Sequence, residues 1–187
     1  MNLSKNILIK NIIIVGGGSS GWLTAAYLSN NFPNLNITIV DKEIGTPVGV
    51  GDATLLNFKR FMELCGFPES EWYDEVEATD KLGIAFPNWI EKDHHVYHPF
   101  FVSKTNSKEY KERLKIKWPN SFNAAYHINC GLLTTFIQNR IKDRVKFIAS
   151  EVVSFDNDKL TLKNGDNING DLFIDCSGFF GFLLKKH

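Results

Sequence analysis

The stretch "NIIIVGGGSSGWLTAAYL", residues 11–28, decides the fold of this chain. Its β-branched run, residues 12–15, ends directly in glycines, which is typical of a buried parallel strand. The composition of residues 22–32 predicts a helix, which Pro33 closes. A second apolar run, "NITIV" at residues 36–40, predicts the next strand. A strand, a glycine turn, a helix and a strand within about 30 residues predict a βαβ unit of a parallel sheet.

Three glycines of this stretch, Gly16, Gly18 and Gly21, have the spacing G-x-G-x-x-G of a dinucleotide-binding turn. The first permits a tight turn, the second lets the backbone approach a pyrophosphate, and the third allows close helix–strand packing. Ser19 and Ser20 would lie at the start of the helix, where backbone N–H groups and the helix dipole favour phosphate. The motif lies between a predicted strand and a predicted helix. This context favours nucleotide binding over a glycine-rich turn that binds nothing.

An acidic residue, Asp41, follows the second strand, where a dinucleotide-binding fold holds the ribose. Its carboxylate would accept a ribose hydroxyl, which favours NAD or FAD over NADP. Further along, "FIDCSGF" at residues 173–179 reads as a buried strand that ends in small residues. The backbone at Gly178 can therefore approach a dinucleotide closely, as in FAD-binding folds, and the backbone at Val152 would face the adenine. These features favour FAD, and an NAD-dependent oxidoreductase stays open as an alternative.

The composition of the chain limits its class and its partners. Its 187 residues suit one domain, and its formal net charge of zero predicts neither nucleic acid nor a membrane as a partner. The three cysteines form no C-x-x-C pair, so we expect a protein of the reducing cytoplasm. No metal site is predicted, because His94, His95 and His98 lie on an extended segment without a defined ligand geometry.

The pattern as a whole predicts an α/β protein: an FAD/NAD(P)-binding, Rossmann-like parallel sheet with an inserted helical or irregular segment and a β-hairpin. We expect one FAD-binding domain in three parts. Residues 1–44 form the βαβ dinucleotide unit, residues 45–129 form an insertion, and residues 130–187 return to the sheet. The hairpin is expected from residue 151 onward, with a turn at Asn157 and Asp158.

Several stretches, in the same order along the chain, resemble the flavin-dependent tryptophan halogenases. They are "VGGGSSGWLTAAYL", "GVGDATLLNFKRFMELCGF", "ATDKLGIAFPNW", "YHPF", "AYHIN" and "GDLFIDCSGFFGFLL". Residues 49–54 are similar to the family's G-x-G-E-A-T-x-P loop, with Asp52 in place of Glu and Leu56 in place of Pro. The resemblance implies that this loop lies against the flavin and offers backbone N–H groups to a halide. The loop residues are Gly49, Val50, Gly51, Asp52, Ala53 and Thr54.

The resemblance also implies a reaction and its partners. Reduced FAD, supplied in trans by a separate flavin reductase, reacts with oxygen to give a flavin hydroperoxide, and halide then gives hypohalous acid. Lys81 stands where the family has its catalytic lysine and would relay the halogen to an electron-rich aromatic substrate such as tryptophan or indole. Such a lysine needs a dry apolar passage, and we expect the alternating residues Leu82, Ile84 and Phe86 to line it.

Members of the resembled family are more than twice as long as this chain. The part without a counterpart here carries a W-x-W-x-I-P signature, a catalytic glutamate and most of the substrate-binding region. The resemblance therefore implies that this chain is an N-terminal portion of a halogenase, and it leaves open whether the chain is an enzyme. A catalytically inactive, truncated FAD-binding module stays open as an alternative.

Overall fold

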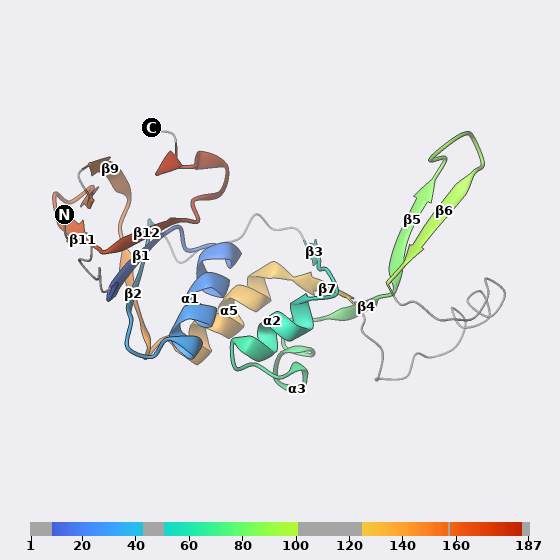
Figure 1. The fold of residues 1–187 in the computed structure, drawn as a ribbon, viewed down its shortest axis with the longest axis horizontal. Coiled ribbons are helices and arrows are strands. Elements are labelled where there is room, and N and C mark those ends of the chain that lie inside the picture. The colour runs from blue at the N-terminus through green and yellow to red at the C-terminus, as the bar shows by residue number, and fades with distance from the viewer. Residues whose placement is uncertain (1–8, 43–50, 101–124, 157, 185–187) are drawn as a thin grey trace, which may run out of the picture.

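A four-stranded parallel sheet carries the glycine turn (Figure 1). The computed structural model of the protein describes residues 9–42, 51–100, 125–156 and 158–184. The strand order is β12–β1–β2–β8, and every neighbouring pair is parallel. The strands are β1 (Asn11–Val15), β2 (Asn36–Asp41), β8 (Val145–Ala149) and β12 (Leu172–Asp175). Because the strands are parallel, their carboxyl ends meet at one edge, where open α/β sheets bind their ligands.

The first strand is buried on both faces, as its β-branched run predicts. Ile12 and Ile14 join one hydrophobic core with α1 (Ser19–Asn31) and α5 (Cys130–Ile141), two helices that pack against each other. Ile13 and Val15 join a second core on the opposite face of the sheet. Successive side chains of a strand point to opposite faces, so an unbroken apolar run fits only a strand that is covered on both sides.

An antiparallel three-stranded sheet covers that opposite face. Its strands are β9 (Val152–Asp156), β10 (Lys159–Leu162) and β11 (Asn167–Asn169), in the order β11–β10–β9. Leu160 and Leu162 of β10 are buried in the second core. The predicted hairpin is confirmed: β9 pairs with β10, and Asp158 in the turn has a φ of +57°, which Asp tolerates. The other predicted turn residue, Asn157, lies outside the described residues.

The segment between β2 and α5 forms a second small sheet. Its strands are β3 (Gly51–Ala53), β4 (Thr79–Lys81) and β7 (Ala125–Asn129), in the antiparallel order β3–β7–β4. Helices α2 (Phe58–Leu64) and α3 (Glu69–Trp72) pack beside it. Tyr126 of β7 is 1% exposed and lies edge-on to Trp72, with 5.0 Å between the ring centroids. The sheet is therefore held to α3 by aromatic packing.

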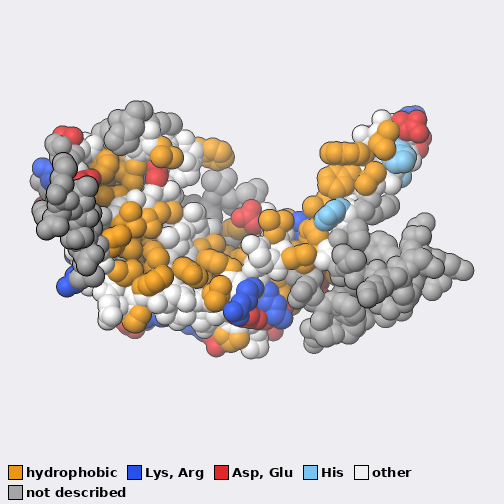
Figure 2. All heavy atoms as spheres, in the orientation of Figure 1, with side chains coloured by type: hydrophobic (Ala, Val, Ile, Leu, Met, Phe, Trp, Pro, Cys, Tyr) orange, Lys and Arg blue, Asp and Glu red, His pale blue; other side chains and the backbone are white. Residues whose placement is uncertain are grey.

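A β-hairpin projects from the rest of the molecule (Figure 1). It consists of β5 (Gly83–Pro87) and β6 (His95–Pro99), paired antiparallel. Trp89 and Ile90 at its turn are 66% and 72% exposed, and Figure 2 shows hydrophobic side chains along the arm. A short 3₁₀ helix, η1 (Gly178–Phe180), follows β12. In the described part of the chain, no helix is long and apolar enough to span a bilayer.

Candidate functional site

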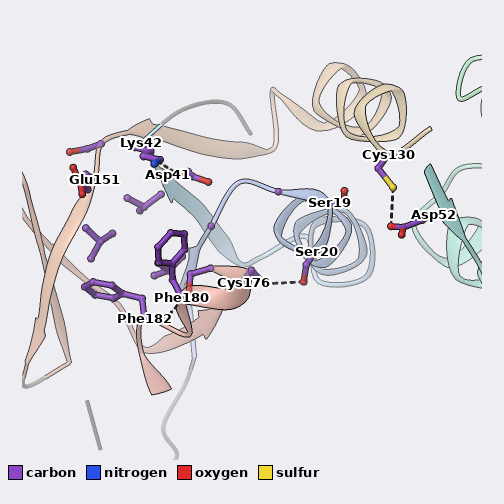
Figure 3. Close-up of a pocket in the computed structure, with 18 residues that line it drawn as sticks. Ser19, Ser20, Asp41, Lys42, Asp52, Cys130, Glu151, Cys176, Phe180 and Phe182 are labelled. Atoms are coloured by element: carbon purple, nitrogen blue, oxygen red, sulfur yellow. Dashed lines mark hydrogen bonds between the residues drawn. The ribbon is translucent and has the colours of Figure 1, made fainter. Parts of the chain in front are cut away.

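A cavity of about 680 Å³ opens at the carboxyl ends of the parallel strands (Figure 3). This volume falls within the range of small-molecule and cofactor sites. Of the residues predicted to bind the cofactor, the cavity wall contains Gly16, Gly18, Ser19, Ser20, Asp41, Asp52, Val152 and Gly178. They come from the ends of β1, β2 and β12, the start of α1, the start of β9, and β3. The structure thus brings together residues that lie up to 162 positions apart in the sequence.

The three glycines of the turn have different roles. Gly16 has a φ of +112°, and a Cβ placed there would lie 2.2 Å from the Cys176 carbonyl oxygen. A Cβ at Gly21 would lie 2.0 Å from the Gly16 carbonyl oxygen. A Cβ at Gly18 would meet nothing within 4 Å, and Gly18 lines the cavity. The fold itself therefore requires Gly16 and Gly21, whereas Gly18 leaves an open cradle that a pyrophosphate would fill.

The first turn of α1 presents backbone donors to this cradle. Gly18 is the N-cap of the helix, and no side chain caps it. Ser19 and Ser20 follow and line the cavity. The first N–H groups of a helix have no partner within the helix and carry its positive dipole end, so this position favours an anion.

Asp41 lies at the end of β2, as predicted. Its Oδ2 accepts a hydrogen bond from the Gly17 N–H (2.6 Å), and its Oδ1 accepts one from the Lys42 N–H (2.7 Å). These bonds fix the carboxylate at the cavity wall. Each carboxylate oxygen has more than one lone pair, so the side chain can still accept a ribose hydroxyl.

Asp175 organises the turn after β12. Its Oδ1 accepts hydrogen bonds from the Ser177 N–H (3.0 Å) and hydroxyl (2.5 Å), and its Oδ2 accepts from the N–H groups of Leu183 (2.7 Å) and Leu184 (3.3 Å). Burial raises the pKa of this carboxyl, but the hydrogen bonds lower it more, so the pKa of Asp175 lies below its ordinary value. The bonds fold residues 176–184 back and hold Gly178 at the cavity.

We expect Asp175→Asn to destabilise the protein at pH 7 by roughly 1 kcal/mol. The asparagine side chain has one oxygen that accepts, and its NH₂ group cannot accept the hydrogen bonds that the second carboxylate oxygen receives. The pKa of Asp175 is depressed in the folded state, so its stabilisation is complete above the unfolded pKa and is lost as pH falls through the folded pKa. The gap in free energy of unfolding between wild type and variant should therefore shrink below about pH 4. Urea denaturation at pH 7 and pH 3.5 measures it, and a gap that stays constant would contradict this account.

Lys81 lies at the end of β4, away from the cavity wall. Its Nζ lies 3.4 Å from the Thr54 carbonyl oxygen and 5.0 Å from the centroid of the Phe100 ring. Phe100 is 8% exposed, so it covers the lysine with an apolar surface. Strand β7 lies between β3 and β4, which separates the strand of Asp52 from the strand of Lys81 by about 10 Å across the sheet.

Of the three residues expected to line a passage to Lys81, Leu82 stays beside it, because its carbonyl oxygen accepts a hydrogen bond from the Phe100 N–H (2.9 Å). Ile84 and Phe86 belong to the projecting hairpin, and the Phe86 ring packs on Trp89 with 4.9 Å between centroids. The alternation indicates a strand correctly but does not identify what the strand faces. Among the described residues, Thr54 and Phe100 lie close to the Lys81 amino group, and the passage itself stays a prediction.

The residues of the predicted flavin loop have different surroundings. Asp52 reaches the cavity wall. Gly51 and Ala53 are exposed residues of β3, and Thr54 contacts Lys81 and β7. Gly49 and Val50 lie outside the described residues.

The cavity wall also contains residues that the sequence did not point to, among them Lys42, Cys130, Ser150, Phe180 and Phe182. Ser150 directly follows β8, so the rule that ligands bind at the carboxyl ends of parallel strands would have found it. Phe180 and Phe182 reach the cavity through the turn that Asp175 holds, which no local pattern indicates.

The fold is that of a Rossmann-like α/β protein, with a cavity at the carboxyl ends of its parallel strands. The sequence profile of the family described as Tryptophan halogenase matches residues 11–119 and 105–187. The chain therefore belongs to the tryptophan halogenase family.

Two curated relatives show the extent of the likeness. The chain is 32% identical to tryptophan 6-halogenase SttH of Streptomyces toxytricini over 237 residues, which cover 94% of this chain and 45% of the relative. It is 30% identical to 7-chloro-L-tryptophan 6-halogenase KtzR of Kutzneria sp. (strain 744), with 94% and 46% covered. The chain thus spans less than half the length of these relatives. The alignment with SttH is also longer than the 187 residues of this chain, so SttH carries additional residues within the matched region.

Solved structures agree with this assignment. The crystal structure of SttH superposes with a TM-score of 0.77 at 29% identity, covering 95% of this chain and 46% of that one. BrvH, a flavin-dependent halogenase from Brevundimonas sp. BAL3, superposes with a TM-score of 0.79 at 26% identity, covering 97% and 45%. The expected fold class and family are confirmed.

Proposed function

We propose that this chain is the FAD-binding and lysine-bearing part of a flavin-dependent halogenase acting on an electron-rich aromatic substrate such as tryptophan or indole. One arrangement carries the proposal: the sheet β3–β7–β4 has Asp52 at the cavity on one edge strand and Lys81 on the other. The sheet thus connects a nucleotide site to a lysine that does not itself line that site. Separate places for the cofactor and for a halogen-carrying lysine are what this chemistry needs.

The residues at the cavity fit FAD. Gly18, Ser19 and Ser20 would hold the pyrophosphate at the start of α1, because no side chain occupies the cradle at Gly18. Asp41 would accept a ribose hydroxyl, and the backbone at Val152 would face the adenine. When bound and reduced, FAD supplies the oxygen chemistry that converts halide into hypohalous acid.

Lys81 would hold the halogen next to the aromatic substrate. A lysine can donate a hydrogen bond to the hypohalite oxygen and make the halogen more electrophilic, or react as an amine to give a haloamine. Its bond to the Thr54 carbonyl is long at 3.4 Å, so the amino group can exchange this partner for an incoming ligand. The Phe100 ring limits the access of water to the amino group.

The remaining partners follow from this chemistry. The halide is the co-substrate, and a separate flavin reductase supplies the reduced flavin. The cysteines of the described residues, Cys65, Cys130 and Cys176, are free thiols, as a protein of the reducing cytoplasm would have them.

Two measurements test the proposed function. Titration of the purified protein with FAD and with NAD, followed by flavin fluorescence and by calorimetry, is expected to show binding of FAD at micromolar or lower concentration and no comparable binding of NAD. Protein supplied with FAD, a flavin reductase, NADH, oxygen and bromide is then expected to convert indole or tryptophan into a brominated product. FAD binding without any product would support the inactive FAD-binding module, and preference for NAD would support the oxidoreductase.

A further inference from the structure

Cys130 and Asp52 meet at the cavity wall. The Cys130 thiol donates a hydrogen bond to Asp52 Oδ2, with 2.9 Å between sulfur and oxygen, as Figure 3 shows. Both residues line the cavity, and Cys130 is 5% exposed. Within the described residues, this is the one side-chain hydrogen bond that the Asp52 carboxylate accepts. The direction of the carboxylate therefore depends on the thiol.

The position of the thiol is itself fixed. Strand β7 runs directly into α5, and Asn129 caps the helix by accepting hydrogen bonds from the N–H groups of Gly131 (3.0 Å) and Leu132 (3.2 Å). The Thr134 hydroxyl donates to the Cys130 carbonyl oxygen (2.8 Å). The pairing of Gly51 with Asn129 in turn sets β3 beside this helix start. The backbone on both sides of the Asp52–Cys130 contact is thus held by hydrogen bonds that do not involve the contact.

The chemistry of the two groups assigns donor and acceptor. Burial and the nearby Asp52 carboxylate raise the pKa of the Cys130 thiol to about 11. At neutral pH the sulfur therefore carries its proton and donates it, and an ionised carboxylate only accepts. A protonated thiol is also a poor nucleophile, so Cys130 is not suited to covalent chemistry at the site.

We propose that Cys130 is a positioning residue whose thiol holds the Asp52 carboxylate at the cofactor cavity. By holding Asp52, it also fixes the position of Thr54 on the same stretch of chain, and thereby of Lys81. Asp52 and Thr54 are two residues apart, and the Thr54 carbonyl oxygen accepts the hydrogen bond of Lys81. The Thr54 hydroxyl also accepts a hydrogen bond from the Tyr126 N–H (2.9 Å). A shift of Asp52 that displaces Thr54 would therefore also disturb this bond to β7. This inference rests on the proposed function in taking the ligand of the cavity to be a flavin and Lys81 to be the residue that carries the halogen.

The first test needs neither flavin nor turnover. Asp52→Asn removes the negative charge beside the thiol, so the pKa of Cys130 should fall and its alkylation by iodoacetamide at pH 8 should become about 3- to 10-fold faster. Peptide mapping by mass spectrometry reads each cysteine separately. Cys176 is the matched control: its sulfur lies near the Ser20 (3.5 Å) and Thr24 (4.0 Å) hydroxyls, and its alkylation rate should stay unchanged. An unchanged alkylation rate at Cys130 would show that the Asp52 carboxylate does not interact with the thiol, and would overturn the proposal.

The second test uses Cys130→Ala and Cys130→Ser. Alanine lacks the donor, whereas the serine hydroxyl can donate to the same carboxylate. We expect Cys130→Ala to lower the bromination rate at saturating FAD about 10-fold and to shift the absorption spectrum of bound flavin, and Cys130→Ser to restore both to within about threefold. Thermal melts establish that both variants are folded.

The outcomes separate this inference from the proposed function. Wild-type activity with an equally active Cys130→Ala variant would overturn the positioning role and leave the halogenase proposal intact. A faster Cys130 alkylation in Asp52→Asn, combined with a flavin spectrum that Cys130→Ala changes and Cys130→Ser restores, would support the positioning role even if wild type brominates nothing. A serine variant as impaired as the alanine variant would overturn it.

Discussion

Replacing Lys81 by Met is expected to abolish bromination of indole and to leave FAD affinity unchanged. Methionine keeps the apolar stem against Phe100 but cannot donate a hydrogen bond to a hypohalite. Because a positioned hydrogen-bonding or proton-transferring group contributes 10²- to 10⁴-fold, the rate should fall by at least about 100-fold. Lys81 lies outside the cavity wall, so flavin titration should give the wild-type dissociation constant. Chromatography of the product and flavin fluorescence measure the two quantities.

Lys159→Met is the control for this change. Lys159 is an exposed residue of β10, on the sheet that covers the far face of the fold. The same substitution there should change the bromination rate by less than about twofold, as is usual for surface positions. Activity retained by Lys81→Met, or equal losses in both variants, would exclude the assigned role of Lys81.

Replacing Gly21 by Ala is expected to have the largest effect on stability. The new Cβ would lie 2.0 Å from the Gly16 carbonyl oxygen, which belongs to the backbone and cannot rotate away. Helix α1 would have to move off the sheet, and because the clash is with backbone we expect a loss of about 3 kcal/mol in the free energy of unfolding. The whole free energy of unfolding of a native protein is only about 5–15 kcal/mol. Urea denaturation measures the loss, and a wild-type curve would show that the helix can shift without cost.

Gly18→Ala is the matched variant within the same turn. Gly18 has φ −77° and ψ −174°, an extended conformation that alanine adopts, and its Cβ would enter open space. The free energy of unfolding should change by no more than about 0.5 kcal/mol. The affinity for FAD should nevertheless fall at least about 10-fold, because the methyl group would occupy the cradle that the pyrophosphate needs. Wild-type affinity in this variant would mean that the phosphates bind elsewhere.

Local sequence patterns predicted the βαβ part of this fold well. The β-branched run of β1, the spacing of Gly16, Gly18 and Gly21, and the position of Asp41 depend on interactions within about 30 residues. Each of these features reaches the place that the pattern implies, and the two glycines in tight contact show why the spacing matters. The predicted hairpin after residue 151 likewise depends on pairing between neighbouring segments of the chain.

The lysine-bearing part was less predictable because its contacts are remote in sequence. Strands β3 and β4 have three residues each, too few for a hydrophobic period, and both pair with β7 far along the chain. The hydrogen bond from Cys130 to Asp52 joins residues 78 positions apart. The contact between Lys81 and Thr54 spans 27 positions. No periodicity encodes such pairs, and only the resemblance to a family singled out Lys81 before the structure placed it.

The position of β12 beside β1 has a consequence for how this protein is made. Val15 pairs with Asp175, and the Gly16 turn closes against the carbonyl of Cys176, so β1 and β12 depend on each other. During synthesis, β1 would have β2 as a neighbour early but would lack its other partner until residues 172–175 emerge from the ribosome. Contacts of such long sequence separation fold slowly. The nascent βαβ unit would therefore wait with an apolar strand edge open, and chaperones that bind extended apolar segments would have their best opportunity at that stage.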